Sequence, residues 1–395
     1  MHKKIIAAAL AASVVTPFAM ADVTLYGVMS ASIESVQGTG GSVTYPSRVR
    51  VTDNNSRIGF KGFEDLGNGL QSIWQVENSL KYFEQGGTND AGQTATFATR
   101  NTFVGLASAQ LGTMQLGYLD SAYKRLTNGG VNVMGDTAAD IDGTTTNVAA
   151  IFSRGEARLK NSVNYTTPVW KGLQGGISYG VDEGQISSTN TQPSNRNHLS
   201  LAAQYNWNSL QIGAGWDHTE HSGGYLGYFN GINATSYSAS AGSNGLSYDA
   251  SGNVDFSKLV ASYKFTTGTF IAAGVERGTY GVAGSSNMAQ TGWTVAATQD
   301  IGNATVKMSY SRLGGLSNTA DPDAYKASEW VLGGTYSLSK TTQLLAYYAR
   351  IDNNALSNVD FANTPLYSNS VGSSSATLAT GNRLSTIGMG MKMTF

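Results

Sequence analysis

Three histidines are the side chains of this sequence best suited to acid–base or metal chemistry. His198, His218 and His221 all fall in or beside segments that we expect to be loops. Dozens of serines in the sequence could pair with each of them, so no particular serine–histidine pair indicates a hydrolase. His218 and His221 could hold a metal together with Glu220, but the spacing is not that of a tight structural site. We therefore expect no enzyme, no cofactor and no bound metal.

Basic side chains occur in a different setting, on one face of alternating stretches. Arg57, Gly59 and Lys61 share one parity, and Ile58 and Phe60 share the other. A strand places successive side chains on opposite faces, so this stretch has one charged or small face and one apolar face. Around Arg100 the alternation between polar and apolar side chains is less regular.

The end of the chain shows the alternation most clearly. Ile387, Met389, Met391, Met393 and Phe395 take every second position, and small or polar residues fill the gaps. Similar period-two stretches occur at 210–217, 258–265, 304–311 and 330–338. A period of two predicts strands, and the fold class is therefore all-β.

The connections between these stretches alternate between short and long. Seven short ones are rich in Gly, Asn, Asp and Ser, as tight hairpin turns are. They fall at 65–69, 108–112, 169–172, 206–209, 266–268, 300–303 and 337–340. Eight long ones fall near 37–55, 83–98, 120–155, 183–196, 219–253, 279–289, 313–327 and 353–381. Fifteen connections join sixteen antiparallel strands in an up-and-down order.

Sixteen strands in one open sheet would leave two bare edges, so we expect the first and last strands to pair and close a barrel. A barrel of this width is too wide for side chains to fill. Its small and polar face must then line a wet lumen, and its apolar face must contact lipid. Aromatic residues near the short turns predict an interfacial girdle. They are Trp170, Tyr205, Trp207, Tyr263, Phe265, Tyr336 and Phe395.

Composition and the N-terminus agree with an exported membrane protein. Residues 1–21 have a basic start, a short apolar core and an Ala-Met-Ala ending, which predicts a cleaved signal peptide. Residues 22–395 would form a single barrel domain. The chain has no cysteine and only 13% charged residues. Its charge is close to balanced, which argues against a nucleic-acid partner.

The sequence resembles the Gram-negative general porins, in the branch typical of beta-proteobacteria. The matching stretches are VTLYGVM at 23–29, SRIGFKGFEDLGNGLQSIWQVE at 56–77, RNTFVGLASAQLGTMQLGY at 100–118, RLKNSVNYTTPVWKGL at 158–173 and the final Phe395. The resemblance implies a homotrimer of sixteen-stranded barrels in the outer membrane, with short periplasmic turns and long outer loops. It also implies that Phe395 belongs to the signal read by the barrel-assembly machinery.

The resemblance further implies that the third long loop, about residues 120–155, folds into the barrel and narrows it. In such channels basic wall residues face acids on this loop, and fixed charge at the narrowest point selects ions. The matching wall positions are Arg57, Lys61, Arg100 and Lys160, and the loop positions are Asp120, Asn128, Asn132, Asp136 and Asp140. Enterobacterial relatives carry acids where this loop has Asn128 and Asn132. We therefore expect a channel for ions and small hydrophilic solutes with a weak preference for anions.

Three other readings remain open on the sequence alone. A solute-specific porin would need an aromatic slide, and Tyr118, Tyr123 and Tyr165 are too scattered to indicate one. A barrel enzyme would need a better site than the three histidines offer. An adhesin with a plugged lumen would need a plug domain, and the strands leave no chain for it. The expected partners are outer-membrane lipid, lipopolysaccharide and small solutes.

Overall fold

The computed structural model of the chain describes residues 22–80, 97–142, 150–181, 197–220, 252–281, 286–366 and 378–395. The expected signal peptide, residues 1–21, lies outside the described residues, so its cleavage stays a prediction. No helix in the described ranges has the length and apolar character needed to cross a membrane.

Seventeen strands and two short helices make up the described chain. The strands are β1 Asp22–Thr39, β2 Tyr45–Asp53, β3 Arg57–Gly67, β4 Leu70–Ser79, β5 Thr102–Ser108, β6 Gly112–Asp120, β7 Arg158–Thr166, β8 Leu173–Gly180, β9 His198–Trp207, β10 Leu210–Thr219, β11 Val254–Lys264, β12 Thr269–Tyr280, β13 Met288–Ile301, β14 Ala304–Leu313, β15 Ala327–Ser337, β16 Thr342–Asn353 and β17 Arg383–Thr394. The helices are α2 Ala122–Leu126 and the 3₁₀ turn η4 Pro322–Tyr325.

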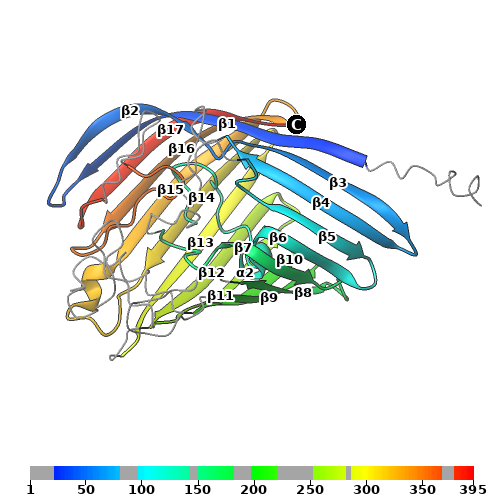
Figure 1. Cartoon of the computed structure of the whole chain (residues 1–395). Helices are drawn as coiled ribbons and strands as arrows, with labels where there is room; N and C mark the ends of the chain where they lie inside the picture. Colours follow the sequence, from blue (N-terminus) through cyan, green and yellow to red (C-terminus); the bar gives the residue numbers. More distant parts are fainter. Residues whose placement is uncertain are drawn as a thin grey trace, which may run out of the picture.

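The strands form one closed antiparallel barrel (Figure 1). Each strand from β3 to β16 pairs with the next one along the chain, as an up-and-down order requires. Closure comes from β1 and β17, which pair from Val28 with Thr394 to Thr39 with Arg383. Because the first strand closes on the last, the sheet has no free edge, which a bilayer requires. The predicted barrel and its closure are confirmed.

The extra strand arises because β2 and β3 are two halves of one barrel strand. Both pair with β1, where Ala31 lies opposite Asp53 and Val28 opposite Arg57. Three residues therefore stand opposite two, which is a bulge. The structural count is sixteen barrel strands. The prediction of a long loop over 37–55 was wrong, because 45–53 is strand and only 40–44 connects it to β1.

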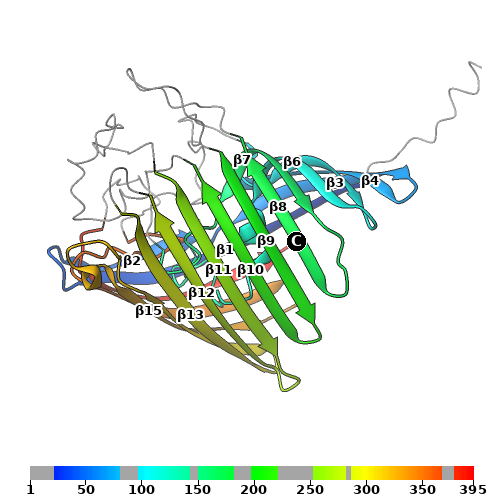
Figure 2. The same cartoon turned by 90° about the horizontal axis from the view of Figure 1, so that it is seen from below.

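The apolar faces point outward, as the alternation predicts. Met389 is 64% exposed and Met391 50%, whereas Thr386 on the other face of β17 is buried. On β11 Leu259 is half exposed, and its neighbours Lys258 and Val260 are buried. Figure 2 shows β8 to β12 as a row of tilted strands along one side of the barrel. A large apolar outer surface would be costly in water and is stable against hydrocarbon.

The predicted aromatic girdle also lies on the surface. The seven residues are between 38% and 67% exposed. The last of them, Phe395, closes the barrel at the backbone: Gly27 N donates to Phe395 O at 2.9 Å, and Phe395 N donates to Gly27 O at 3.2 Å. The Phe395 ring lies over Gly27, where a side chain would not fit.

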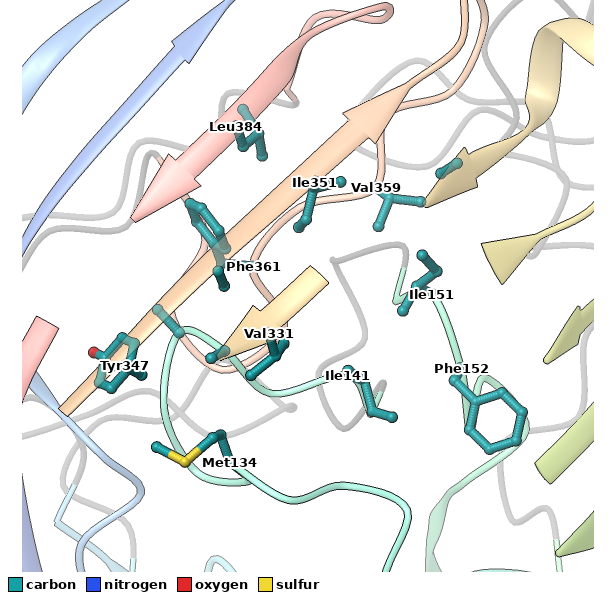
Figure 3. Close-up of a cluster of buried hydrophobic side chains, with 14 of the residues drawn as sticks. Met134, Ile141, Ile151, Phe152, Val331, Tyr347, Ile351, Val359, Phe361 and Leu384 are labelled. Carbon is teal, nitrogen blue, oxygen red and sulfur yellow. The ribbon is translucent and has the colours of Figure 1, made fainter. Parts of the chain in front are cut away.

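The interior is not uniformly watery. Among the described connections, the third loop (121–157, described at 121–142 and 150–157) and the last loop (354–382, described at 354–366 and 378–382) fold into it. Their apolar side chains form one buried cluster with inward residues of β15, β16 and β17 (Figure 3). The labelled members are Met134, Ile141, Ile151, Phe152, Val331, Tyr347, Ile351, Val359, Phe361 and Leu384. The described part of the third loop confirms that it turns inward.

Candidate functional site

The third loop begins with α2, which lies on the inner wall against β8, β9 and β10. Two serines of the barrel wall accept hydrogen bonds from its first backbone N–H groups. Ala122 N donates to Ser178 Oγ at 2.8 Å, and Tyr123 N donates to Ser200 Oγ at 2.9 Å. A short helix leaves its first N–H groups unpaired, and the inward face of the barrel supplies their acceptors.

Glycines on the wall let the loop backbone come close. A Cβ placed on Gly213 of β10 would stand 2.5 Å from the carbonyl oxygen of Leu126. On Gly215 it would stand 2.9 Å from side-chain atoms of Tyr123 and Thr127. The small residues of the inward face thus create the recess in which the loop lies.

We expect Gly213→Ala to destabilise the docked third loop. The new methyl would collide with backbone, which cannot move aside as a side-chain tip can, so the cost is about 1–3 kcal/mol. The lower free energy of unfolding is measured by denaturant titration of the protein in detergent. Gly175→Ala is the matched control, because its Cβ would meet Thr167 at an ordinary 3.6 Å. Equal unfolding midpoints for both variants would contradict the recess.

A buried ion pair fixes the far end of the loop. Lys258 Nζ on β11 lies 2.7 Å from Glu156 Oε1 and donates to Ser153 Oγ at 3.1 Å. Both charged side chains are almost completely buried, at 0% and 3% exposure. Beside them Glu276 accepts a 2.6 Å hydrogen bond from the Tyr123 hydroxyl, together with loop backbone N–H groups. The loop is therefore tied to β11 and β12 at both its start and its end.

A carboxylate organises the tip of the loop. Asp140 accepts hydrogen bonds from the backbone N–H of Asp136 and Asp142, both at 2.8 Å. The Asn132 amide donates to Asp140 at 2.6 Å and to Asp142 at 2.9 Å. Asp136 has a φ of +69°, a left-handed conformation that is uncommon for a residue with a side chain. This network holds the tight turn.

The two buried carboxyls of the tip, Asp140 and Asp142, have pKa values well above the ordinary value of 3.8. Burial raises the pKa of Asp140 to about 6, against the opposing effect of its backbone hydrogen bonds. Burial, reinforced by the charges of Glu156 and Asp140, raises the pKa of Asp142 to about 8. The charged form is disfavoured because water is excluded.

We expect the protein to lose stability as pH rises from about 4 to about 8. In that window the folded protein retains protons on Asp140 and Asp142 that the unfolded chain releases. Each such proton lowers the free energy of unfolding by up to about 1.4 kcal/mol per pH unit. Denaturant titrations in detergent at several pH values measure the slope. Asp142→Asn should flatten it, and an unchanged slope in that variant would contradict the assignment.

Opposite the tip stands the basic wall. Asp136 Oδ2 lies 3.6 Å from Arg57 NH1 and 3.7 Å from Lys392 Nζ. Its other oxygen accepts a 2.7 Å hydrogen bond from Asn55 Nδ2. Asn55 sits in the bulge between β2 and β3 with a φ of +58°, and the bulge turns its amide into the lumen. One loop acid is thus shared by two wall cations.

Arg100 and Lys61 extend this wall. Arg100 Nε lies 2.5 Å from Glu77 Oε1, and its NH1 donates to Asn55 Oδ1 at 2.8 Å. Lys61 Nζ lies 5.2 Å from the ring centre of Tyr26, whose hydroxyl donates to Glu77. Within this described group, four basic side chains (Arg57, Lys61, Arg100, Lys392) face two acids, Glu77 and Asp136, an excess of two positive charges.

The structure brings only some of the sequence-predicted residues to this place. Asp120 lies at the base of the third loop, 3.0 Å from Arg158 and 3.7 Å from Lys124. Lys160 is exposed, and Arg158, two residues earlier, is the base that pairs with Asp120. Asn128 is exposed and accepts a turn hydrogen bond from Gly130 N. Asn132 and Asp140 face each other within the loop.

Two members of the wall were not among the sequence predictions. Lys392 lies on the polar face of the terminal strand, so its inward direction could be read from the alternation. Its partner on the third loop could not. Asn55 was expected in a loop, and no sequence pattern predicts the bulge that directs its side chain toward Asp136.

A closed barrel with an apolar outside, a charged inside and a loop folded across its interior defines a transmembrane channel. The family model of the Gram-negative porins matches residues 7–356 of the chain. The protein belongs to the Gram-negative porin family, and it forms a diffusion channel in the outer membrane.

Individual relatives agree with this assignment. The major outer membrane protein P.IB of Neisseria meningitidis serogroup B, strain H44/76, is 30% identical over 354 residues, covering 87% of this chain and 92% of the relative. The anion-selective porin from Comamonas acidovorans shares the fold with a TM-score of 0.68 at 18% identity, covering 95% of this chain and 100% of that one. The in-vitro folded OmpT of Vibrio cholerae, in its trimer form, has a TM-score of 0.62 at 15% identity and coverages of 95% and 99%.

Proposed function

We propose that this channel weakly prefers anions. The observation that carries the proposal is the excess of two positive charges in the group of four basic and two acidic side chains around Asp136. A permeating ion in this partly desolvated gap experiences these charges more strongly than it would in bulk water. The Comamonas neighbour is described as anion-selective, but at 18% identity that likeness concerns the fold alone.

The test is the reversal potential of the purified protein in a planar bilayer that separates two KCl concentrations. The expected sign is that of chloride passing more readily than potassium. A clear preference for potassium would end the proposal of anion preference, although the channel itself would stand. A saturable, solute-dependent block of the current would instead favour the alternative of a solute-specific porin.

We infer that the channel works as a homotrimer. The support is family membership and the trimer form of the Vibrio cholerae neighbour. Current that appears in groups of three equal steps, together with a trimer band on a gel run without heating, is the expected result. Steps of single size at all protein concentrations would contradict it.

The remaining roles of the chain follow from the same proposal. Lipid and lipopolysaccharide would contact the apolar outer face, and the barrel-assembly machinery would read the C-terminal strand with its final Phe395. The constriction roles of Arg57, Lys61, Arg100 and Asp136 belong to this proposal too. In it Asn132 and Asp140 hold the loop tip, and Asp120, Asn128 and Lys160 act from outside the charged group around Asp136.

We further propose that the protein is not an enzyme. Residues 176–180 read Gly-Ile-Ser-Tyr-Gly, which matches the G-x-S-x-G pattern of hydrolases. That pattern needs a serine on a sharp strand-to-helix turn, whereas Ser178 lies inside β8, and its hydroxyl bonds Asn164 and the N–H of Ala122. A ring nitrogen of His198 lies 2.6 Å from the Asp217 carboxylate, and its other ring nitrogen lies 3.2 Å from the Thr219 hydroxyl. A ring nitrogen of His218 lies 2.7 Å from the Asp255 carboxylate. His221 lies outside the described residues. Lipid hydrolysis by the purified protein would refute this reading.

A further inference from the structure

The last loop enters the barrel and becomes part of its interior. Phe361 is completely buried, and Val359 and Leu366 are 1% and 3% exposed. They belong to the same cluster as Met134 and Ile141 of the third loop (Figure 3). Two loops that are more than 200 residues apart in sequence therefore share one apolar core inside the channel.

Two arginines of β2 hold the last loop against the wall. Arg50 NH1 donates to the carbonyl oxygen of Pro365 at 2.6 Å, and its NH2 donates to that of Thr364 at 2.7 Å. Arg48 donates to the carbonyl oxygen of Leu366. Arg50 is itself fixed by Glu34, with Nε 2.6 Å from Oε1. Charged donors form strong hydrogen bonds, so this stretch of loop has a defined position.

From this position the last loop reaches the residue that carries the charge of the constriction. Asn363 Nδ2 donates to the backbone carbonyl oxygen of Asp136 at 2.8 Å and to that of Asp53 at 3.3 Å. The Asp136 carboxylate is the group that lies between Arg57 and Lys392. The amide of Asn363 thus joins the tip of the third loop to the wall strand.

This hydrogen bond holds the backbone of the tip, whereas Asn55 and the wall cations hold only the side chain of Asp136. α2 and Glu156 fix the start and the end of the third loop to β8–β12. The tip around Asp136 crosses to the opposite wall, where it meets Asn55 and the basic side chains. A backbone carbonyl bonded from the last loop restricts the tip in a way that solvated ion pairs do not.

We propose that the described stretch 354–366 of the last loop is a second constriction element, and that Asn363 is a positioning residue that sets where Asp136 stands in the channel. This inference rests on the proposed channel function. Without the hydrogen bond from Asn363, Asp136 spends less time between the two wall cations. The passage then becomes wider, its current noisier, and its preference for anions stronger.

The test compares Asn363→Ala with Asn354→Ala. Asn354 also belongs to the last loop, and its side chain donates to the carbonyl oxygen of Asp323 at 2.7 Å, but it is exposed. Asn363→Leu is a second variant, which keeps the approximate shape of the side chain and removes its hydrogen bonds without adding a charge. Each variant is measured as the full-length protein in a planar bilayer under a KCl gradient.

A chemical readout accompanies the electrical one. The chain has no cysteine, so Val133→Cys places a single thiol in the third loop at a site that is 9% exposed. In this background Asn363→Ala should speed labelling by a water-soluble thiol reagent about fivefold, the factor that corresponds to losing about 1 kcal/mol of hydrogen bonding. Asn354→Ala should label at the parent rate.

The expected result is a larger, noisier current and a stronger anion preference in both Asn363 variants, with faster labelling. A reversal potential, conductance and labelling rate equal to those of Asn354→Ala would overturn the inference while leaving the channel intact. If the unaltered protein carries no current, the channel function fails instead. A substitution that changes only the stability of the protein leaves the reversal potential unchanged. This measurement therefore separates a positioning role of Asn363 from a purely structural one.

Discussion

Replacing Arg57 with glutamate should convert a channel that prefers chloride into one that prefers potassium. The described wall group carries an excess of two positive charges, and the substitution removes both. It also sets a carboxylate beside Asp136, which strengthens the attraction for cations. At about 6 Å a unit charge changes the energy of an ion by about 0.7 kcal/mol even at the dielectric constant of water. Two charges therefore raise the energy of chloride and lower that of potassium by about 1.4 kcal/mol each, which changes the permeability ratio on the order of a hundredfold before screening.

The measurement is the reversal potential under a KCl gradient, at low and at high ionic strength. The effect should shrink in strong salt because screening shortens the reach of the charge. Arg277→Glu is the control, since it makes the same charge change at an exposed position near the outer end of β12. The role of Arg57 fails if the two variants have the same reversal potential. Arg100→Glu is a poorer test, because it opposes two carboxylates at a 2.5 Å contact with Glu77.

Lys258→Met should release the third loop from the wall. The substitution leaves Glu156 buried with only Lys124, 3.9 Å away, as its basic partner, next to Glu276 on the strand beside β11. Breaking a buried pair by removing one side costs about 3–5 kcal/mol, much more than an exposed pair is worth. We expect a large loss of unfolding free energy in detergent, and a higher and more variable conductance in bilayers, because the constricting loop is no longer fixed.

Two further variants make this prediction sharp. Lys264→Met breaks a pair with Asp300 in which both side chains are 45% exposed, and it should change neither stability nor conductance measurably. Lys258→Met combined with Glu156→Gln removes both charges, and it should recover part of the lost stability. If the double variant is no more stable than the single one, the buried charge of Glu156 is not the cause.

The paths of the third and last loops inside the barrel depend on contacts between distant parts of the chain. The alternating pattern says that Lys392 faces inward, but only the closed barrel sets it 3.7 Å from Asp136. Asp140 and Asp136 look alike in sequence, yet one is buried in its own turn and the other meets the wall. The burial of Phe361 against the third loop has no local signal, because polar, Gly- and Ser-rich loops read as exposed.

The sequence by itself determined that this is a barrel turned inside out. Side chains of a strand alternate with a period of two, so the outer and inner faces, the strand order and the apolar terminal strand are all local properties. The tertiary structure alone decided which charges meet at the constriction. That outcome depends on barrel closure, a one-residue bulge at Asn55 and the packing of two loops, and each of these couples residues that are far apart along the chain.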